Sequence, residues 1–322
     1  MDLLTIPLHD AFAPLAVSFV LAAMGLNIHY GYTGLLNFGQ AAFAAVGAYA
    51  MGVAIASFDV PFIPAVILGV LFSVLLALLM GIPTLRLRAD YLAIVTIAVA
   101  EVLRLFFTTT NKDYFHARDG VSGFTSGFRN ANPYSEGMLG FSRNDLWVMT
   151  VGWLLVAFFC LLTWLLVRSP WGRVLKSIRE DEDAVRSLGK NVYYYKLQAL
   201  ILGGVIGAFG GFVGALGLAS VQPDSYNLDF TFIAFTMLIL GGAARVLSPV
   251  VGAVLFWGLL SFLQTLLSKL IGEWGVIPDS ILNSEQIGNV RFMVVGLSLM
   301  LLMIYRPQGI FGDKKELAID GR

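Results

Sequence analysis

Long apolar stretches separated by short polar ones dominate the hydrophobic pattern of this chain. A helix that spans a membrane needs about 20 mostly apolar residues, and nine stretches come close to that length. They are residues 11–30, 34–57, 61–82, 90–109, 145–167, 197–219, 230–246, 249–271 and 290–305. The second and seventh stretches are rich in glycine and alanine, a composition typical of broken or re-entrant segments. The pattern predicts an all-α polytopic membrane protein with roughly 8–10 transmembrane helices, some of them broken.

Composition supports the membrane class. Of the 322 residues, 57% are hydrophobic and only 13% are charged, against roughly 25% charged residues in a soluble domain. Lys and Arg total 21, as do Asp and Glu, and no basic domain points to nucleic acid. We therefore predict one transmembrane domain, residues 1–322, with two longer polar segments at 111–144 and 168–196.

The distribution of Lys and Arg predicts the orientation. If segment 168–196 is cytoplasmic, alternation of the spans places 14 basic residues on the cytoplasmic side and 6 on the other. This asymmetry agrees with the positive-inside rule. It predicts an extracytoplasmic N-terminus, a cytoplasmic C-terminus and an extracytoplasmic loop at 111–144.

The pattern of segment 168–196 is typical of a surface that binds another protein. Ser169–Gly172 ends the preceding span, because proline cannot continue a helix. Residues 173–179 then carry apolar side chains at helical spacing, and the four acids at 180–183 suit the N-terminus of a second short helix, where the helix dipole favours negative charge. Gly189 is a natural C-cap. The predicted partner contacts are Arg173, Ile178, Glu180, Asp181, Glu182, Asp183, Ala184, Val185, Leu188 and Gly189.

Polar residues in the glycine-rich region 25–52 are candidates for a transport path. Glycine lets helices approach closely, and it also permits a break that lines a cavity. The sequence leaves two interpretations open: tight helix packing, or a translocation path lined by Asn27, Asn37 and Gln40. His29 is interpreted as an interfacial residue, because no second metal ligand stands at a suitable spacing.

Three further features have two interpretations each. Glu101 and Arg104 are spaced i,i+3 on one predicted helix, so their side chains can pair. Placing ionisable groups at membrane depth costs free energy. The two residues therefore either form a structural ion pair or act in gating. Gln222–Asp224 is a turn or an outer gate. The aromatic and glycine residues of 111–144 predict a folded patch, which either docks a soluble partner or caps the helix bundle.

Several motifs together resemble one family. SPWGRVLKSIREDEDAVRSLGKN, followed by KLQALILGGVIGAFGGFVGAL, resembles the cytoplasmic loop and next helix of permease subunits of branched-chain amino-acid ABC importers, of the LivM type. Asp183-Ala184-Val185 with Gly189 is similar to the Glu-Ala-Ala-x-x-x-Gly pattern of importer coupling loops, with Asp for Glu and Val for the second Ala. NFGQAAFAAVGAYA, LGGAARVLSPVVGA and YRPQGIFG also match. Gln40 stands where the family more often has His, and Arg245 lies in a turn usually made of small residues.

The resemblance implies a multisubunit importer in the bacterial cytoplasmic (inner) membrane. A second permease of the same fold, two cytoplasmic ATPases and an extracytoplasmic solute-binding protein would complete it. Transport would proceed by alternating access, with the substrate path at the interface of the two permeases. Related importers carry branched-chain amino acids, and close relatives carry urea or short amides.

The sequence also indicates that transport and ATP hydrolysis take place in different subunits. The chain has no G-x-x-x-x-G-K-[ST] phosphate loop, so we expect ATP to be hydrolysed by partner subunits, with no enzyme activity and no cofactor or metal in this chain. A secondary transporter or channel stays an alternative, with Glu101 and Arg104 as its coupling candidates. A membrane enzyme would need a catalytic cluster, which the scattered His9, His29 and His116 do not offer.

Overall fold

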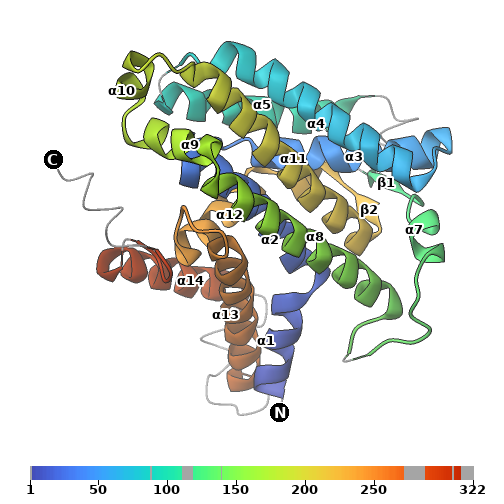
Figure 1. Ribbon diagram of the computed structural model, residues 1–322. Helices are drawn as coiled ribbons and strands as arrows, with labels where there is room; N and C mark the ends of the chain where they lie inside the picture. The colour runs from blue at the N-terminus through green and yellow to red at the C-terminus, as the bar shows by residue number, and fades with distance from the viewer. Residues whose placement is uncertain are drawn as a thin grey trace.

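The computed structural model describes residues 2–87, 89–110, 119–138, 140–271, 287–306 and 308–312, and most of these residues are helical (Figure 1). The N-terminal half contains α1 Asp2–Phe12, α2 Pro14–Leu26, the π-helix η1 Asn27–Tyr32, α3 Gln40–Phe58, α4 Phe62–Thr84, α5 Ala89–Thr109, β1 Val121–Ser122 and α7 Ser126–Asn130. The C-terminal half contains α8 Arg143–Arg168, α9 Pro170–Glu180, α10 Glu182–Ser187, α11 Val192–Leu218, β2 Ser220–Val221, the 3-10 helix η3 Pro223–Tyr226, α12 Leu228–Gly241, α13 Ser248–Ile271 and α14 Ile287–Tyr305.

Each of the nine predicted stretches contains a helix. Within the described ranges, seven helical segments are long and apolar enough to cross a membrane: Pro14–Tyr32, Gln40–Phe58, Phe62–Thr84, Asp90–Thr109, Arg143–Arg168, Val192–Leu218 and Ser248–Leu270. Leu228–Gly241 and Ile287–Ser298 are shorter apolar helices. The prediction of an all-α polytopic membrane protein is confirmed.

The two glycine-rich stretches differ from simple spans, as their composition indicated. Residues 34–39 are not helical, and Gly34 has a φ of +72°, a conformation that glycine adopts readily. The seventh helix, α12, is only 14 residues long. It ends before Gly242, whose φ is +100°, and Ala244 in the following turn is also left-handed. The predicted stretch 230–246 is therefore too long at its C-terminal end.

The N-terminal helix α1 was not predicted. The first apolar stretch was placed at 11–30, but Pro14 begins a separate helix, and α1 packs beside α13 (Figure 1). The Ser261 hydroxyl donates a hydrogen bond of 2.5 Å to the Asp10 carboxylate across this contact. A short helix of mixed polarity carries too weak an apolar signal to separate it from the span that follows.

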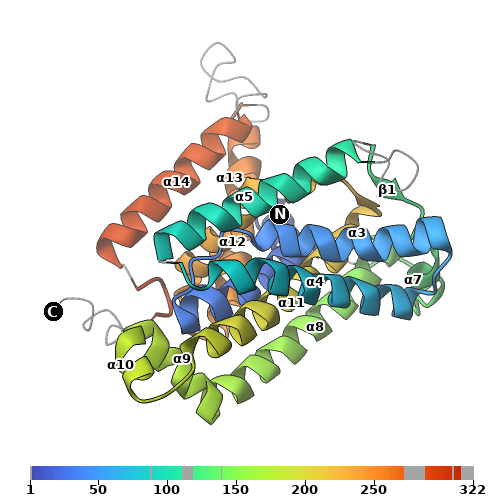
Figure 2. The ribbon, with the colours of Figure 1, turned by 90° about the horizontal axis from the view of Figure 1, so that it is seen from above.

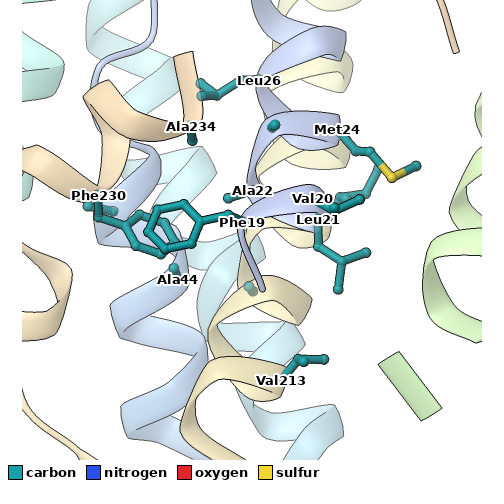
Figure 3. Close-up of a cluster of buried hydrophobic side chains, with 14 of the residues drawn as sticks. Phe19, Val20, Leu21, Ala22, Met24, Leu26, Ala44, Val213, Phe230 and Ala234 are labelled. Carbon is teal, nitrogen blue, oxygen red and sulfur yellow. The ribbon is translucent and has the colours of Figure 1, made fainter. Parts of the chain in front are cut away.

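Helices α2 and α11 form the centre of the bundle. Every residue of α2 from Ala16 to Leu26 is buried, and α11 packs against α2, α3 and α4. Figure 3 shows the apolar cluster around α2, where the rings of Phe19 and Phe230 lie 4.7 Å apart between centroids. A helix that is apolar on all sides belongs in such an interior.

The molecule has two distinct ends. Figures 1 and 2 place α9 and α10 at one end and β1 and α7 at the other. The two short strands pair antiparallel, with Val121 opposite Val221. Long-range contacts join segments that the charge pattern had placed on the same side, such as Arg179 with Gly31 at the α9 end. Which end faces the cytoplasm stays a prediction.

Candidate functional site

The polar segment between α8 and α11 folds into two short helices, as its sequence predicted. Pro170 begins α9, and the Ser169 hydroxyl oxygen accepts a bond from the Gly172 amide at its N-terminus. The acids occupy the junction: Glu180 ends α9, and the Asp181 carboxylate accepts a 2.9 Å bond from the Ala184 amide as the N-cap of α10. Gly189 follows α10 with a φ of +76°.

Burial divides the ten predicted contact residues into three groups. Ile178 and Val185 are 4% and 6% exposed, so they hold the loop against the bundle and are not available to a partner. Leu188 is 80% exposed. The others that are open to solvent are Arg173, Glu180, Asp181, Asp183, Ala184 and Gly189, while Glu182 is half-buried.

Three side-chain contacts attach the loop to the bundle. The Arg179 guanidinium donates a 2.6 Å bond to the Gly31 carbonyl in η1. The Trp171 indole N–H donates a 2.8 Å bond to the Gln198 side chain of α11, and Glu182 forms an ion pair with Lys196 at the start of the same helix. The two helices and the bundle therefore form one connected body at this end.

A polar cavity lies under the loop. Its volume is about 260 Å³, and Arg179, Glu182 and Lys196 line it together with Gly34 and the α4–α5 turn. The sequence interpretation missed Arg179 and Lys196 as functional residues. Their partners lie far away along the chain or across a helix boundary, so no local spacing could have identified them.

The predicted path residues lie in a buried polar network between α2, η1, α3 and α11. The Asn27 side chain donates to the Arg245 carbonyl at 2.8 Å and accepts from the Ala244 amide at 2.9 Å. Asn37 donates to His29 Nδ1 at 3.0 Å, and His29 Nε2 then donates to the Leu200 carbonyl at 3.1 Å. Gln40 donates to the carbonyls of Ala22 and Gly203.

This network gives Asn27, Asn37 and Gln40 a packing role. All three are at most 1% exposed, and most of their polar atoms bond to neighbouring backbone. The Gln40 side-chain oxygen is the exception, with no hydrogen-bond partner among the described residues. The interpretation of His29 as interfacial is wrong, because its side chain is fully buried. A path-lining role for the three amides stays a prediction.

Glu101, Arg104 and Asp224 form one charged cluster. Arg104 bonds to Glu101 at 2.6 Å along α5 and to Asp224 of η3 at 3.0 Å. The predicted ion pair is confirmed, and it is extended by a residue that the sequence had placed in a separate turn. The cluster fastens η3 to α5, while a gating role stays a prediction.

The described part of segment 111–144 packs onto the bundle. Phe124 is fully buried and Phe128 is 6% exposed, and the Trp147 indole N–H donates a 3.0 Å bond to the Phe128 carbonyl. These inward contacts fit a cap on the helices. Tyr114 and Phe115, part of the predicted patch, fall outside the described residues, and docking of a soluble partner stays a prediction.

Comparison with known proteins assigns the family. Residues 9–304 match the model of the family described as "Branched-chain amino acid transport system / permease component". The chain belongs to this family. The resemblance drawn from the sequence motifs is thereby confirmed, and the protein is a membrane permease of an ABC transporter family.

Known permeases of related transporters are similar in sequence to most of this chain. It is 26% identical over 313 residues to the high-affinity branched-chain amino acid transport system permease protein LivM of Escherichia coli, covering 92% of this chain and 68% of the relative. It is 23% identical to the probable branched-chain amino acid transport permease protein LivM of Methanocaldococcus jannaschii, covering 92% and 91%. It is also 25% identical to the nucleoside ABC transporter permease protein NupC of Lactococcus lactis subsp. cremoris, covering 76% and 74%.

Proposed function

We propose that this permease is the transmembrane subunit of an ATP-driven importer of branched-chain amino acids. A second permease, two cytoplasmic ATPases and an extracytoplasmic binding protein complete the transporter, and the ATPases hydrolyse the ATP. The family match and the LivM relatives, which cover nearly the whole chain, support this assignment. The chain sits in the bacterial inner membrane with its N-terminus outside and its C-terminus inside.

One observation carries the coupling mechanism: an exposed pair of short helices is tied directly to the membrane helices. Leu188 and the acids of α10 offer a surface to a partner, while Arg179 binds the backbone of η1. Movement of an ATPase against α9 and α10 would therefore reach η1 and α11 without an intervening flexible segment. Alternating access requires such a connection, because the partner must favour one arrangement of the helices over the other.

The substrate path runs beside α5 at the interface with the second permease. The Glu101 side chain is 46% exposed and that of Asp224 is 78% exposed, and carboxylates at or near membrane depth face protein or water because lipid excludes them. The buried amides Asn27, Asn37 and Gln40 would reach the path only if the α2–α3–α11 contact opens during transport.

Gly189 provides the sharpest test of the coupling surface. A side chain placed there meets nothing within 4 Å in this chain, so Gly189→Arg does not crowd the interior, although the φ of +76° strains any side chain at this position. Gly189→Ala is the matched control, because it carries the same backbone strain without the long charged side chain. We expect Gly189→Arg to abolish uptake with normal membrane insertion, and Gly189→Ala to retain it.

Charge reversal at 180–183 should likewise stop uptake. Because Asp181 also caps α10 and Glu182 pairs with Lys196, that variant changes the loop as well as its surface and is the less specific of the two. Normal uptake by Gly189→Arg would refute the coupling role.

Two other substrate classes are candidates: a nucleoside permease is among the relatives, and the family that the sequence motifs resemble also includes importers of urea or short amides. The ligand that thermally stabilises the associated binding protein separates these classes. We expect leucine, isoleucine or valine to stabilise it; stabilisation by urea or a nucleoside alone would overturn the amino-acid assignment.

A further inference from the structure

The polar cavity under the loop also has apolar walls. Its lining comes from residues 33–35, the turn between α4 and α5, the two loop helices and the start of α11, which meet at one end of the molecule (Figure 2). Leu35, Leu85, Leu92 and Ile178 form the apolar walls, and each is at most 5% exposed. The cavity volume of about 260 Å³ suits one small molecule, because drug-sized ligands occupy pockets of about 300–1,000 Å³.

An ion pair in this lining has hydrogen-bonding capacity that the loop does not use. Lys196 and Glu182 both line the cavity and bind each other directly. The Lys196 side chain is only 13% exposed, and its ammonium bonds within the described residues to Glu182 alone, although an ammonium has three N–H donors. The Glu182 carboxylate accepts from Lys196 and Arg186 and has about four acceptor sites. A mostly buried cation and an anion therefore offer further bonds side by side.

We propose that this cavity binds one branched-chain amino acid as its zwitterion. The α-carboxylate accepts from Lys196, the α-ammonium donates to Glu182, and the branched side chain covers the apolar walls. The choice of solute rests on the function proposed above, which delivers branched-chain amino acids to this side of the membrane. A phosphate would face the like charge of Glu182, and an apolar ligand would leave the remaining donors and acceptors of the ion pair unsatisfied.

A bound amino acid would hold the loop against the bundle. Its contacts connect α10, α11 and the turn between α4 and α5, so it favours the arrangement in which these elements lie together over any other. The coupling mechanism requires the loop to move when the ATPases move. The transported solute, once it has accumulated on the ATPase side, should therefore slow its own import.

The test measures leucine binding to the purified full-length permease by isothermal titration calorimetry. Three analogues each lack one group: N-acetyl-leucine lacks the ammonium, leucinamide lacks the carboxylate, and glycine lacks the apolar side chain. We expect leucine to bind at least tenfold more tightly than each of them. A charge-assisted hydrogen bond and a buried leucine side chain each contribute about that factor or more.

Variants of the lining locate the binding site. Lys196→Gln should raise the Kd of leucine at least tenfold. Lys190→Gln is the matched control and should leave this Kd unchanged, because Lys190 belongs to the same loop but is exposed and is not among the lining residues. Leu92→Phe keeps the ion pair and fills the apolar side of the cavity, so it should weaken leucine binding and leave glycine binding unchanged.

The complete transporter in proteoliposomes separates this site from the proposed function. Unlabelled leucine on the ATPase side should slow ATP-driven uptake of labelled leucine, and Leu92→Phe should reduce this inhibition. Normal uptake without leucine binding to the permease, or with a Kd unchanged in both Lys196→Gln and Leu92→Phe, would overturn the cavity site alone. Displacement of leucine by inorganic phosphate would also overturn it and indicate an anion site. Leucine binding in the cavity without any ATP-driven leucine uptake would support the site and contradict the proposed function.

Discussion

Arg179 joins the loop to η1 through one of the three side-chain contacts that attach the loop to the bundle. Its guanidinium bonds to the Gly31 carbonyl, and its stem packs on Gly34, where an added Cβ would stand 3.4 Å from Arg179 Cγ. The acceptor belongs to a π-helix, a form that occurs often at functional sites. The two residues are 148 positions apart in the sequence, so no local sequence pattern predicts this contact.

Arg179→Ala should uncouple transport from ATP hydrolysis. A hydrogen bond from a charged group contributes about 1.5–3 kcal/mol, so its loss should reduce uptake tenfold or more while ATP hydrolysis by the assembled transporter continues. The measurement is uptake per ATP hydrolysed in proteoliposomes. Arg143→Ala, at the opposite end of α8, is the control and should leave this ratio unchanged; an unchanged ratio for Arg179→Ala would exclude the proposed connection.

Gly203 marks the closest approach of α11 to α2 and η1. A Cβ on this residue would overlap the His29 imidazole and the Gly25 carbonyl. Gly203→Ala should therefore destabilise the permease by about 1–3 kcal/mol through overpacking, seen as a lower melting temperature in detergent. Gly296→Ala is the matched control, because that helical glycine has open space around it; equal melting temperatures for the two variants would contradict the packing role.

At the scale of elements, an ion pair between Arg104 and Asp224 connects η3 to α5. The Arg104–Asp224 pair is solvent-exposed on the Asp224 side, and exposed pairs contribute under about 1 kcal/mol. Asp224→Asn should lower thermal stability slightly, by an amount that disappears at high salt, and leave the KM for substrate unchanged. A large change in KM at unchanged stability would favour the gating interpretation instead.

An element can be predicted from the sequence when the residues that determine its ends lie within or beside it. The ends of α9 and α10 could be predicted because proline, a cap and a left-handed glycine act within a few residues. The break at 34–39 could be suspected from glycine content, but its extent depends on Asn37 reaching His29. The early end of α12 depends in the same way on Asn27 holding the 244–245 turn.

For the whole molecule, apolar length and basic asymmetry predicted the class and the grouping of loops at two ends. Each of the nine stretches overlaps a described helix, and seven of these helices are long and apolar enough to span a membrane, because a bilayer imposes a similar length and polarity on every span. The candidate site was predictable only in part. Its outer residues follow from helical spacing, whereas its attachment through Arg179, Gln198 and Lys196 arises from packing between distant segments.

ATP-dependent uptake tests the central claim most directly. The permease pair is reconstituted in proteoliposomes with its binding protein, with or without the two ATPases, and the accumulation of labelled leucine is measured with ATP supplied on the ATPase side. We predict accumulation only when both the ATPases and ATP are present, and none from an ion gradient alone. Leucine accumulation driven by an ion gradient in the absence of the ATPases would contradict the account and indicate a secondary transporter.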